Sequence, residues 1–90
     1  MLRGKFRIEV DPKAARDLKK LRRSNLALTK RIIKLIDSIP ANPSSGKTLK
    51  GHKQGCYSLR SGDYRIIYEV YPSQELIHII RVGHRKDIYR

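Results

Sequence analysis

The chain has 90 residues and carries 21 Lys and Arg against 8 Asp and Glu, a formal charge of +13. A chain this short suits one domain with a thin core, so residues 1–90 are expected to form a single domain. Charge this one-sided indicates a nucleic acid or an acidic protein partner that neutralises it, the alternative being charge that serves solubility alone.

The sequence also argues against the secreted and membrane classes. Cys56 is the only cysteine, so no disulfide framework can form and a reducing compartment is the default. The first ten residues have no apolar stretch of the kind a secretory signal needs. No apolar run reaches the roughly 18–20 residues of a membrane span. We therefore expect a cytoplasmic protein with no membrane contact.

The N-terminal residues predict a strand followed by a helix start. Phe6, Ile8 and Val10 alternate with charged residues, the period of two that a half-buried strand shows. Asp11 and Pro12 then have the residue types of an N-cap and a first helical position.

Two amphipathic helices are expected next, the first running from Pro12 to about Arg23. Its apolar positions, at helical spacing, are Ala14, Ala15, Leu18 and Leu21. Asn25 follows the break at Ser24 and can cap the second helix, which Pro40 and Pro43 end. The apolar stripe of the second helix is Leu28, Ile32, Leu35, Ile36 and Ile39. The short joint makes the pair a helical hairpin.

The second half of the chain predicts a loop, three strands and a basic tail. Residues 41–55 are rich in Gly, Pro and Lys and form the expected loop. From Cys56 to Val82 the period is two again, with turns at residues 61–63 and 72–75. The order β-α-α-β-β-β predicts an α+β fold, a helical hairpin packed on a small, mainly antiparallel sheet. The predicted core contains Leu18, Leu21, Ile32, Ile36, Leu59, Ile66, Tyr68 and Ile79.

The turn at residues 61–63 fixes which side chains share a face. If Gly62 and Asp63 are the central residues of a type II′ turn, Arg60 lies directly opposite Arg65. A three-residue loop would change this register. Like charges in such positions destabilise a sheet by roughly a few tenths of a kcal/mol unless an anion lies between them, and the alternative is that both side chains point into solvent. The face shared with these arginines would hold Cys56, Ser58, Ile67 and Glu69, and the core face Tyr57, Leu59, Ile66 and Tyr68.

The last strand adds a second basic segment at the same end of the sheet. Because residues 76–82 pair with the preceding strand, their C-terminal end returns beside Arg65. The residues that can gather there are Arg65, Arg81, His84, Arg85 and Tyr89. The Lys-rich loop enters the same sheet and can border the cluster with Lys47, Lys50, His52 and Lys53.

These residue types favour metal-independent cleavage of RNA. The histidines lack the spacing of a zinc site, and we expect neither a metal nor a cofactor. Cleavage needs a base for the 2′-hydroxyl, an acid for the leaving 5′-oxygen and fixed cations for the charge on the phosphorane. Arginine suits the last task, because its planar fork binds two phosphate oxygens, and histidine suits the first, because it titrates near neutrality.

Two segments together resemble the RelE/ParE superfamily of toxins from type II toxin–antitoxin modules. They are residues 59–68 (LRSGDYRIIY) and 82–89 (VGHRKDIY), preceded by residues 47–51 (KTLKG), which are similar to that family's approach to its second strand. The resemblance covers the whole chain. It implies a RelE-like toxin, a ribosome-dependent endoribonuclease that cleaves mRNA and inhibits translation. The alternative is a ParE-like poison of DNA gyrase with no nuclease chemistry.

The same resemblance implies partners and roles for individual residues. The partners would be an acidic, RelB-like antitoxin in a hetero-oligomer, the ribosome and mRNA. Arg65 and Arg85 match arginines that act on the phosphate, and Tyr89 matches a tyrosine that stacks on a base or transfers a proton. His84 falls where some members carry a catalytic histidine. The residues expected to bind RNA or the ribosome are Arg60, Arg81, Lys47, Lys50, His52, Lys53 and Lys86.

The chain departs from the best-known RelE-type enzymes in its second predicted strand. Those enzymes carry two lysines there, and this sequence has Cys56 and Ser58 instead. The residues that can take over the acid–base work are Lys50, His52 or Lys53 from the loop, or His84 as the base.

Overall fold

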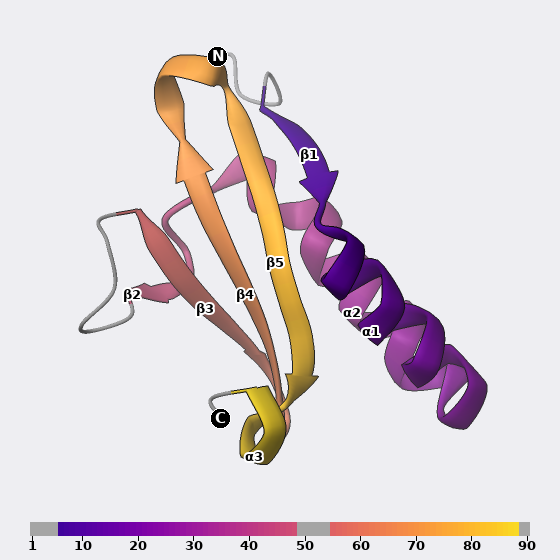
Figure 1. The fold of residues 1–90 in the computed structure, drawn as a ribbon. Helices are drawn as coiled ribbons and strands as arrows, with labels where there is room; N and C mark the ends of the chain where they lie inside the picture. Colours follow the sequence, from indigo (N-terminus) through magenta and orange to yellow (C-terminus); the bar gives the residue numbers. More distant parts are fainter. Residues whose placement is uncertain (1–5, 49–54, 89–90) are drawn as a thin grey trace.

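The computed structural model describes residues 6–48 and 55–88 as a five-stranded sheet with a helical hairpin (Figure 1). Strand order is β1-β5-β4-β3-β2, with β1 parallel to β5 and the other neighbours antiparallel. This confirms the predicted α+β fold. The elements are β1 (Arg7–Val10), α1 (Pro12–Ser24), α2 (Leu26–Ser38), η1 (Ile39–Ala41), β2 (Lys47–Thr48), β3 (Cys56–Ser61), β4 (Tyr64–Tyr71), η2 (Pro72–Gln74), β5 (Leu76–His84) and α3 (Arg85–Ile88).

The predicted capping residues begin the two long helices. The Asp11 side chain accepts a hydrogen bond from the backbone N–H of Lys13 at 2.9 Å, which satisfies one of the free donors of α1. Asn25 serves both helices: its backbone N–H donates to Leu21 O at 2.7 Å and its side chain accepts from Leu28 N at 3.1 Å. One residue thus ends α1 and begins α2, which makes the hairpin tight.

Two elements were missed by the sequence analysis. β2 lies within the predicted loop and is only two residues long, with no alternation to detect; it exists because Lys47 and Thr48 pair with β3. α3 lies within the predicted basic tail and is a single turn, too short for a helical period. It folds back on β5 at Gly83, where a Cβ would lie 3.8 Å from the Cβ of Ile88, in ordinary van der Waals contact.

The β5 strand contains a bulge that strict alternation could not predict. Ile67 pairs with Arg81 and the next residue, Tyr68, pairs with Ile79, so one residue of β5 is extra. The shift returns Val82 to the helix face, where it is 3% exposed. It also carries the end of β5, including His84, to the same face as Tyr64.

The core lies between the helices and one face of the sheet, largely as predicted. Six of the eight predicted core residues are buried, and Leu18 and Leu59 are partly buried against them. Tyr68 is fully buried; its hydroxyl donates to Pro43 O at 2.8 Å and accepts from Gly46 N at 3.1 Å. A Cβ on Gly46 would lie 2.8 Å from that hydroxyl, so only glycine allows the chain to approach so closely.

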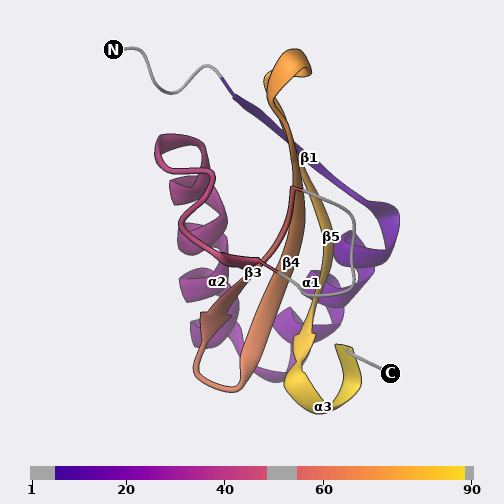
Figure 2. The ribbon, with the colours of Figure 1, turned by 90° about the vertical axis from the view of Figure 1, so that its left-hand side faces the viewer.

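One expectation about exposure is wrong. Val10, predicted to face inward, is 42% exposed, because it is the last residue of an edge strand and the chain leaves the sheet at Asp11. The sheet face that carries the arginines is not uniformly open: Cys56, Ser58 and Ile67 on it are all buried. Figure 2 shows α2 on one side of the β4–β5 ladder and α3 on the other, so both faces receive some cover.

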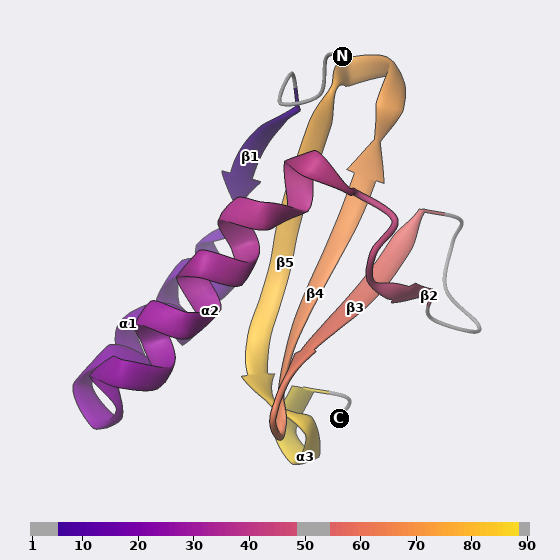
Figure 3. The same ribbon diagram turned by 180° about the vertical axis from the view of Figure 1, so that it is seen from behind.

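Seen from behind, α2 runs along the β1 and β5 side of the sheet, and the short β2 strand lies at the opposite edge (Figure 3). The described helices include none that is long and apolar enough to span a membrane.

Candidate functional site

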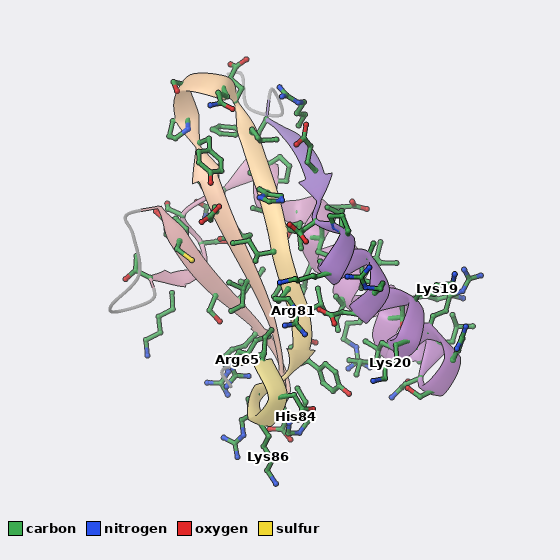
Figure 4. The ribbon with its side chains drawn as sticks, in the orientation of Figure 1. Lys19, Lys20, Arg65, Arg81, His84 and Lys86 are labelled. Carbon is green, nitrogen blue, oxygen red and sulfur yellow. The ribbon has the colours of Figure 1, made fainter. Side chains whose placement is uncertain are left out.

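Three of the four predicted catalytic residues, Arg65, His84 and Arg85, lie where the β3–β4 turn reaches the end of β5. In the β4–β5 ladder Tyr64 pairs with His84 and Arg65 pairs with Gly83. The backbone N–H of Arg85 donates to Asp63 O at 2.8 Å, which ties α3 to the turn. Figure 4 shows Arg65, His84 and Lys86 at this end of the molecule. Segments about twenty residues apart in sequence therefore form one basic tip.

Arg65 and Arg60 are the cross-strand pair of residues that the turn predicts. They lie directly opposite each other in the β3–β4 ladder. Arg65 is half-buried, and its Nη1 donates to Gly62 O and Tyr64 O, both at 3.2 Å, which anchors the side chain at the turn. Within residues 6–48 and 55–88 no carboxylate forms a salt bridge with either arginine. Two arginines on facing residues, with no carboxylate partner among the described residues, suit the binding of an anion.

The His84 imidazole is held in one orientation by two contacts. Its Nδ1 accepts a hydrogen bond from Lys86 N at 3.1 Å, so the neutral ring carries its proton on Nε2. Its ring meets Tyr64 edge to face, with centroids 5.6 Å apart and planes at 79°. In this tautomer His84 offers an N–H donor, whereas service as a base at Nε2 would require the proton to move to Nδ1 and displace Lys86 N.

The α3 turn presents the remaining residues of the tip. Arg85 and Lys86 are both exposed, and the packing of Ile88 on Gly83 holds the turn against the sheet. Tyr89, predicted to be catalytic, lies outside the described residues.

The structure describes only one of the loop residues that were predicted to bind RNA. Lys47 is exposed on β2 and pairs with Ser58, at the opposite edge of the sheet from β1. Lys50, His52 and Lys53 lie outside the described residues. Cys56 and Ser58, which stand where RelE-type enzymes carry lysines, are 5% and 7% exposed. Both are thus buried on the sheet face that carries Arg60 and Arg65.

Arg81, which the sequence predicted to bind RNA, already forms an ion pair with Asp17. Its Nε and Nη2 donate to Oδ2 and Oδ1 of Asp17 at 2.8 and 3.2 Å. The hydrogen bond to Asp17 raises the pKa of the guanidinium, with burial acting in the opposite direction. Arg81 stands close to the tip but is held toward α1.

A groove between α1 and the end of β5 contains a basic residue that the sequence analysis missed. The groove has a volume of about 400 Å³. Its lining includes Lys20 and Ser24 of α1, Arg81 and His84 of β5, and Asp87 of α3. Figure 4 shows Lys20 on the side of α1 toward the tip. A second, shallower hollow of about 310 Å³ lies beside α2, and the Tyr64–His84 ring pair lines both.

The sequence does contain a pattern that includes Lys20: basic residues recur at helical spacing along α1. Lys13, Arg16, Lys20 and Arg23 recur every three or four residues, so they share one face of α1. All four are exposed. Without a structure, this face could not be placed next to β5 rather than on the far side of the hairpin.

Among the described residues, no three His, Cys, Asp or Glu side chains gather where they could hold a metal ion. The functional groups that the described residues present at the tip are therefore guanidinium groups, an imidazole N–H and ammonium groups. Such a set can bind an anion at several points and stabilise charge that develops on it.

A helical hairpin on a five-stranded sheet with a basic tip is the architecture of toxins from type II toxin–antitoxin systems. Residues 8–89 match the family described as ParE toxin of type II toxin-antitoxin system, parDE. The match covers nearly the whole chain, and the chain belongs to this family. It is RelE-like among these toxins.

Three relatives illustrate the likeness. The toxin RelE1 of Methanocaldococcus jannaschii is 32% identical over 88 residues, which cover 96% of this chain and 97% of that protein. Toxin RelG of Mycobacterium tuberculosis is 42% identical over 45 residues, or 50% of this chain and 52% of RelG. The toxin–antitoxin complex RelBE2 of the same organism contains a chain that matches with a TM-score of 0.76 and 27% identity, covering 89% of this chain and 98% of that chain.

Proposed function

We propose that this toxin is a ribosome-dependent endoribonuclease that cleaves mRNA without a metal and so inhibits translation. The observation that carries the proposal is the pair Arg60 and Arg65, which forms no salt bridge in the described part of the chain and lies at the same end of the sheet as His84. Two guanidinium groups and one imidazole N–H match the needs of a phosphorane, whose charge grows in the transition state. The RelE name of two relatives supports the same reaction.

In the proposed reaction the 2′-oxygen of one nucleotide attacks the adjacent phosphorus, and the bond from phosphorus to the 5′-oxygen breaks. The products are a 2′,3′-cyclic phosphate and a free 5′-hydroxyl. Arg65 and Arg85 hold the phosphate through charge-assisted hydrogen bonds. His84 donates its Nε2–H to a phosphate oxygen, as its hydrogen bond from Lys86 N favours.

The proton transfers fall to residues outside the described part of the chain. Lys50, His52, Lys53 and Tyr89 are the candidates for the base and the acid, because Cys56 and Ser58 are buried. His84 remains the alternative base, but in that role its Nδ1 would lose the hydrogen bond that it accepts from Lys86 N. A positioned acid or base contributes about 10²–10⁴-fold to such a rate.

RNA binding is proposed for the exposed cations around the tip. Arg60 and Lys86 lie next to the phosphate position, and Lys20 lines the groove that leads from it toward α1. Lys47, with Lys50, His52 and Lys53 of the loop, would contact RNA or the ribosome at the other edge of the sheet. Each contact to a phosphate adds affinity that falls with salt.

The proposed partner is an acidic, RelB-like antitoxin that binds this toxin in a hetero-oligomer. The charge of +13 requires neutralisation, and structural neighbours of this chain come from toxin–antitoxin complexes. An antitoxin that covers the tip would block the site. The toxin would act in the cytoplasm, where it meets ribosomes.

The alternative function is that of a ParE-like poison of DNA gyrase, and the family match to ParE toxins favours it. In vitro translation with primer extension separates the two. We expect the wild-type toxin to cut mRNA on ribosomes, with the cyclic phosphate end. Gyrase-dependent DNA breaks with intact mRNA would establish the alternative.

A further inference from the structure

The edge of β5 changes its partner halfway along the strand. β1 pairs with β5 only as far as Ile79, whose carbonyl accepts the N–H of Asp11 at 2.8 Å. Beyond this point the α1 helix, rather than a strand, lies beside β5, in agreement with Figure 1. Backbone N–H groups on an open strand edge need other acceptors.

The Asp17 carboxylate supplies that acceptor at the bulge. Its Oδ2 accepts from Val82 N at 2.9 Å and from Arg81 Nε at 2.8 Å, and its Oδ1 accepts from Arg81 Nη2 at 3.2 Å. A single side chain of α1 thus binds two successive residues of β5, just after the extra residue of the bulge.

The bulge decides where the end of β5 points. It returns Val82 to the core against Ile66 and brings His84 opposite Tyr64. His84 follows Val82 by two residues, so a strand that is fixed at Val82 also fixes the imidazole. Bulges re-aim side chains in this way next to functional sites.

The same contacts use the guanidinium of Arg81. Two of its donors are bound to one carboxylate in the bidentate geometry that makes Arg–carboxylate pairs strong. The two side chains are only 40% and 18% exposed, so solvent screens the pair incompletely. A phosphate would have to replace Asp17 to bind the same donors.

We propose that Asp17 and Arg81 are a positioning pair that fixes the end of β5, and with it His84, and that Arg81 makes no contact with RNA phosphate. This assigns Arg81 a different role from the RNA contact that the sequence predicted. The effect on catalysis rests on the proposed nuclease function, whereas the effect on β5 does not.

The first test reads the strand itself and needs no activity. Amide hydrogen exchange by NMR should show the Val82 N–H at least about tenfold less protected in Asp17→Ala than in the wild type, because its acceptor is gone. Asp37→Ala, which removes an exposed carboxylate of α2, is the matched control and should leave Val82 unchanged. Asp17→Leu keeps the branched shape of the side chain without any acceptor oxygen, so it provides the same measurement if the alanine variant does not fold. Wild-type protection of Val82 in both Asp17 variants would overturn the proposal.

The second test asks whether Arg81 touches phosphate. The log–log salt slope for binding a single-stranded oligoribonucleotide falls in magnitude by about 0.7 for each phosphate that the protein no longer neutralises. We expect Arg81→Ala to keep the wild-type slope and Lys86→Gln to reduce it by about 0.7. A reduction of about 0.7 in Arg81→Ala would contradict the assignment.

The third test concerns positioning in the reaction. Asp17→Ala and Arg81→Ala should each lower kcat for mRNA cleavage by up to about 10²-fold while KM changes little, because the site is misaligned and not weakened. The double variant should be no slower than the slower single variant, since both changes remove one pair. Additive losses would show that the two residues act separately. If the wild type cuts no mRNA, the proposed function fails, and the exchange experiment still decides the role of Asp17.

Discussion

Arg60 and Arg65 lie directly opposite each other near the tip of the β3–β4 hairpin. The exposed Arg60 and the half-buried Arg65 form no salt bridge in the described part of the chain. Such a pair is unfavourable for folding and favourable for binding an anion. Stability and function should therefore respond to its removal with opposite signs.

The first prediction uses this opposition. Arg60→Gln should raise the free energy of unfolding by a few tenths of a kcal/mol at low salt, because it removes one of two facing charges, and should weaken RNA binding. Urea unfolding and oligoribonucleotide binding measure the two effects. At about 1 M salt, where the Debye length is about 3 Å, the gain in stability should vanish.

Lys47→Gln is the matched control for that prediction, because Lys47 lies opposite the uncharged Ser58. It should leave stability unchanged. If Arg60→Gln destabilises the toxin at low salt, the two guanidinium groups do not repel each other as the geometry implies.

The second prediction concerns the groove beside α1. Lys20→Gln should reduce the salt slope of single-stranded RNA binding by about 0.7, because the variant neutralises one phosphate fewer. Lys34→Gln, an exposed lysine of α2 that lines neither hollow, should keep the wild-type slope. Equal slopes for Lys20→Gln and the wild type would remove the groove from the RNA path.

The third prediction tests the tautomer of His84. A Gln amide can donate from about the place of Nε2, so His84→Gln should retain most cleavage, whereas His84→Ala should lose about 10²–10³-fold. Single-turnover cleavage rates give the comparison. If His84 is instead the base, both variants should lose about 10²–10⁴-fold and the pH–rate profile should lose a limb near neutrality.

The fourth prediction concerns the buried hydroxyl of Tyr68. Burial raises the pKa of Tyr68, with the hydrogen bond from Gly46 acting in the opposite direction. The unfolded chain has the ordinary tyrosine pKa of about 10, so the contribution of Tyr68 to folding stability is fully present below that pH. It is lost as the pH rises from there toward the folded pKa, because in that range Tyr68 ionises only in the unfolded chain. Tyr68→Phe should remove the part of the fall in folding stability at alkaline pH that Tyr68 causes.

At pH 7 the same change should cost about 1–3 kcal/mol, because Pro43 O and Gly46 N lose their partner. Urea unfolding of both proteins from pH 7 to 11 checks both effects: the difference between them should shrink as the pH rises. A constant difference across this range would mean that Tyr68 ionises equally in both states.

Much of the fold could be predicted because it depends on local residue types. Asp11 and Asn25 are residue types that cap helices, and each stands just before apolar residues at helical spacing. The turn at Gly62 and Asp63 sets the register of the hairpin through its own two residues. The strand pairing that follows brought Arg65 beside the end of β5, as predicted.

The missed features depend on contacts between distant segments. The bulge after Ile79 and the pairing of Asp17 with Arg81 arise only when α1 packs against β5, and neither leaves a local pattern. For the same reason the sequence presented Arg81 as a free cation.

The most direct test of the account is mRNA cleavage on ribosomes by Arg65→Ala and Arg85→Ala, with Tyr89→Phe as the companion variant and antitoxin binding as the check on folding. If the arginines stabilise the phosphorane, each alanine variant should lose at least about 10²-fold in single-turnover rate. Wild-type cleavage by both arginine variants would contradict the account.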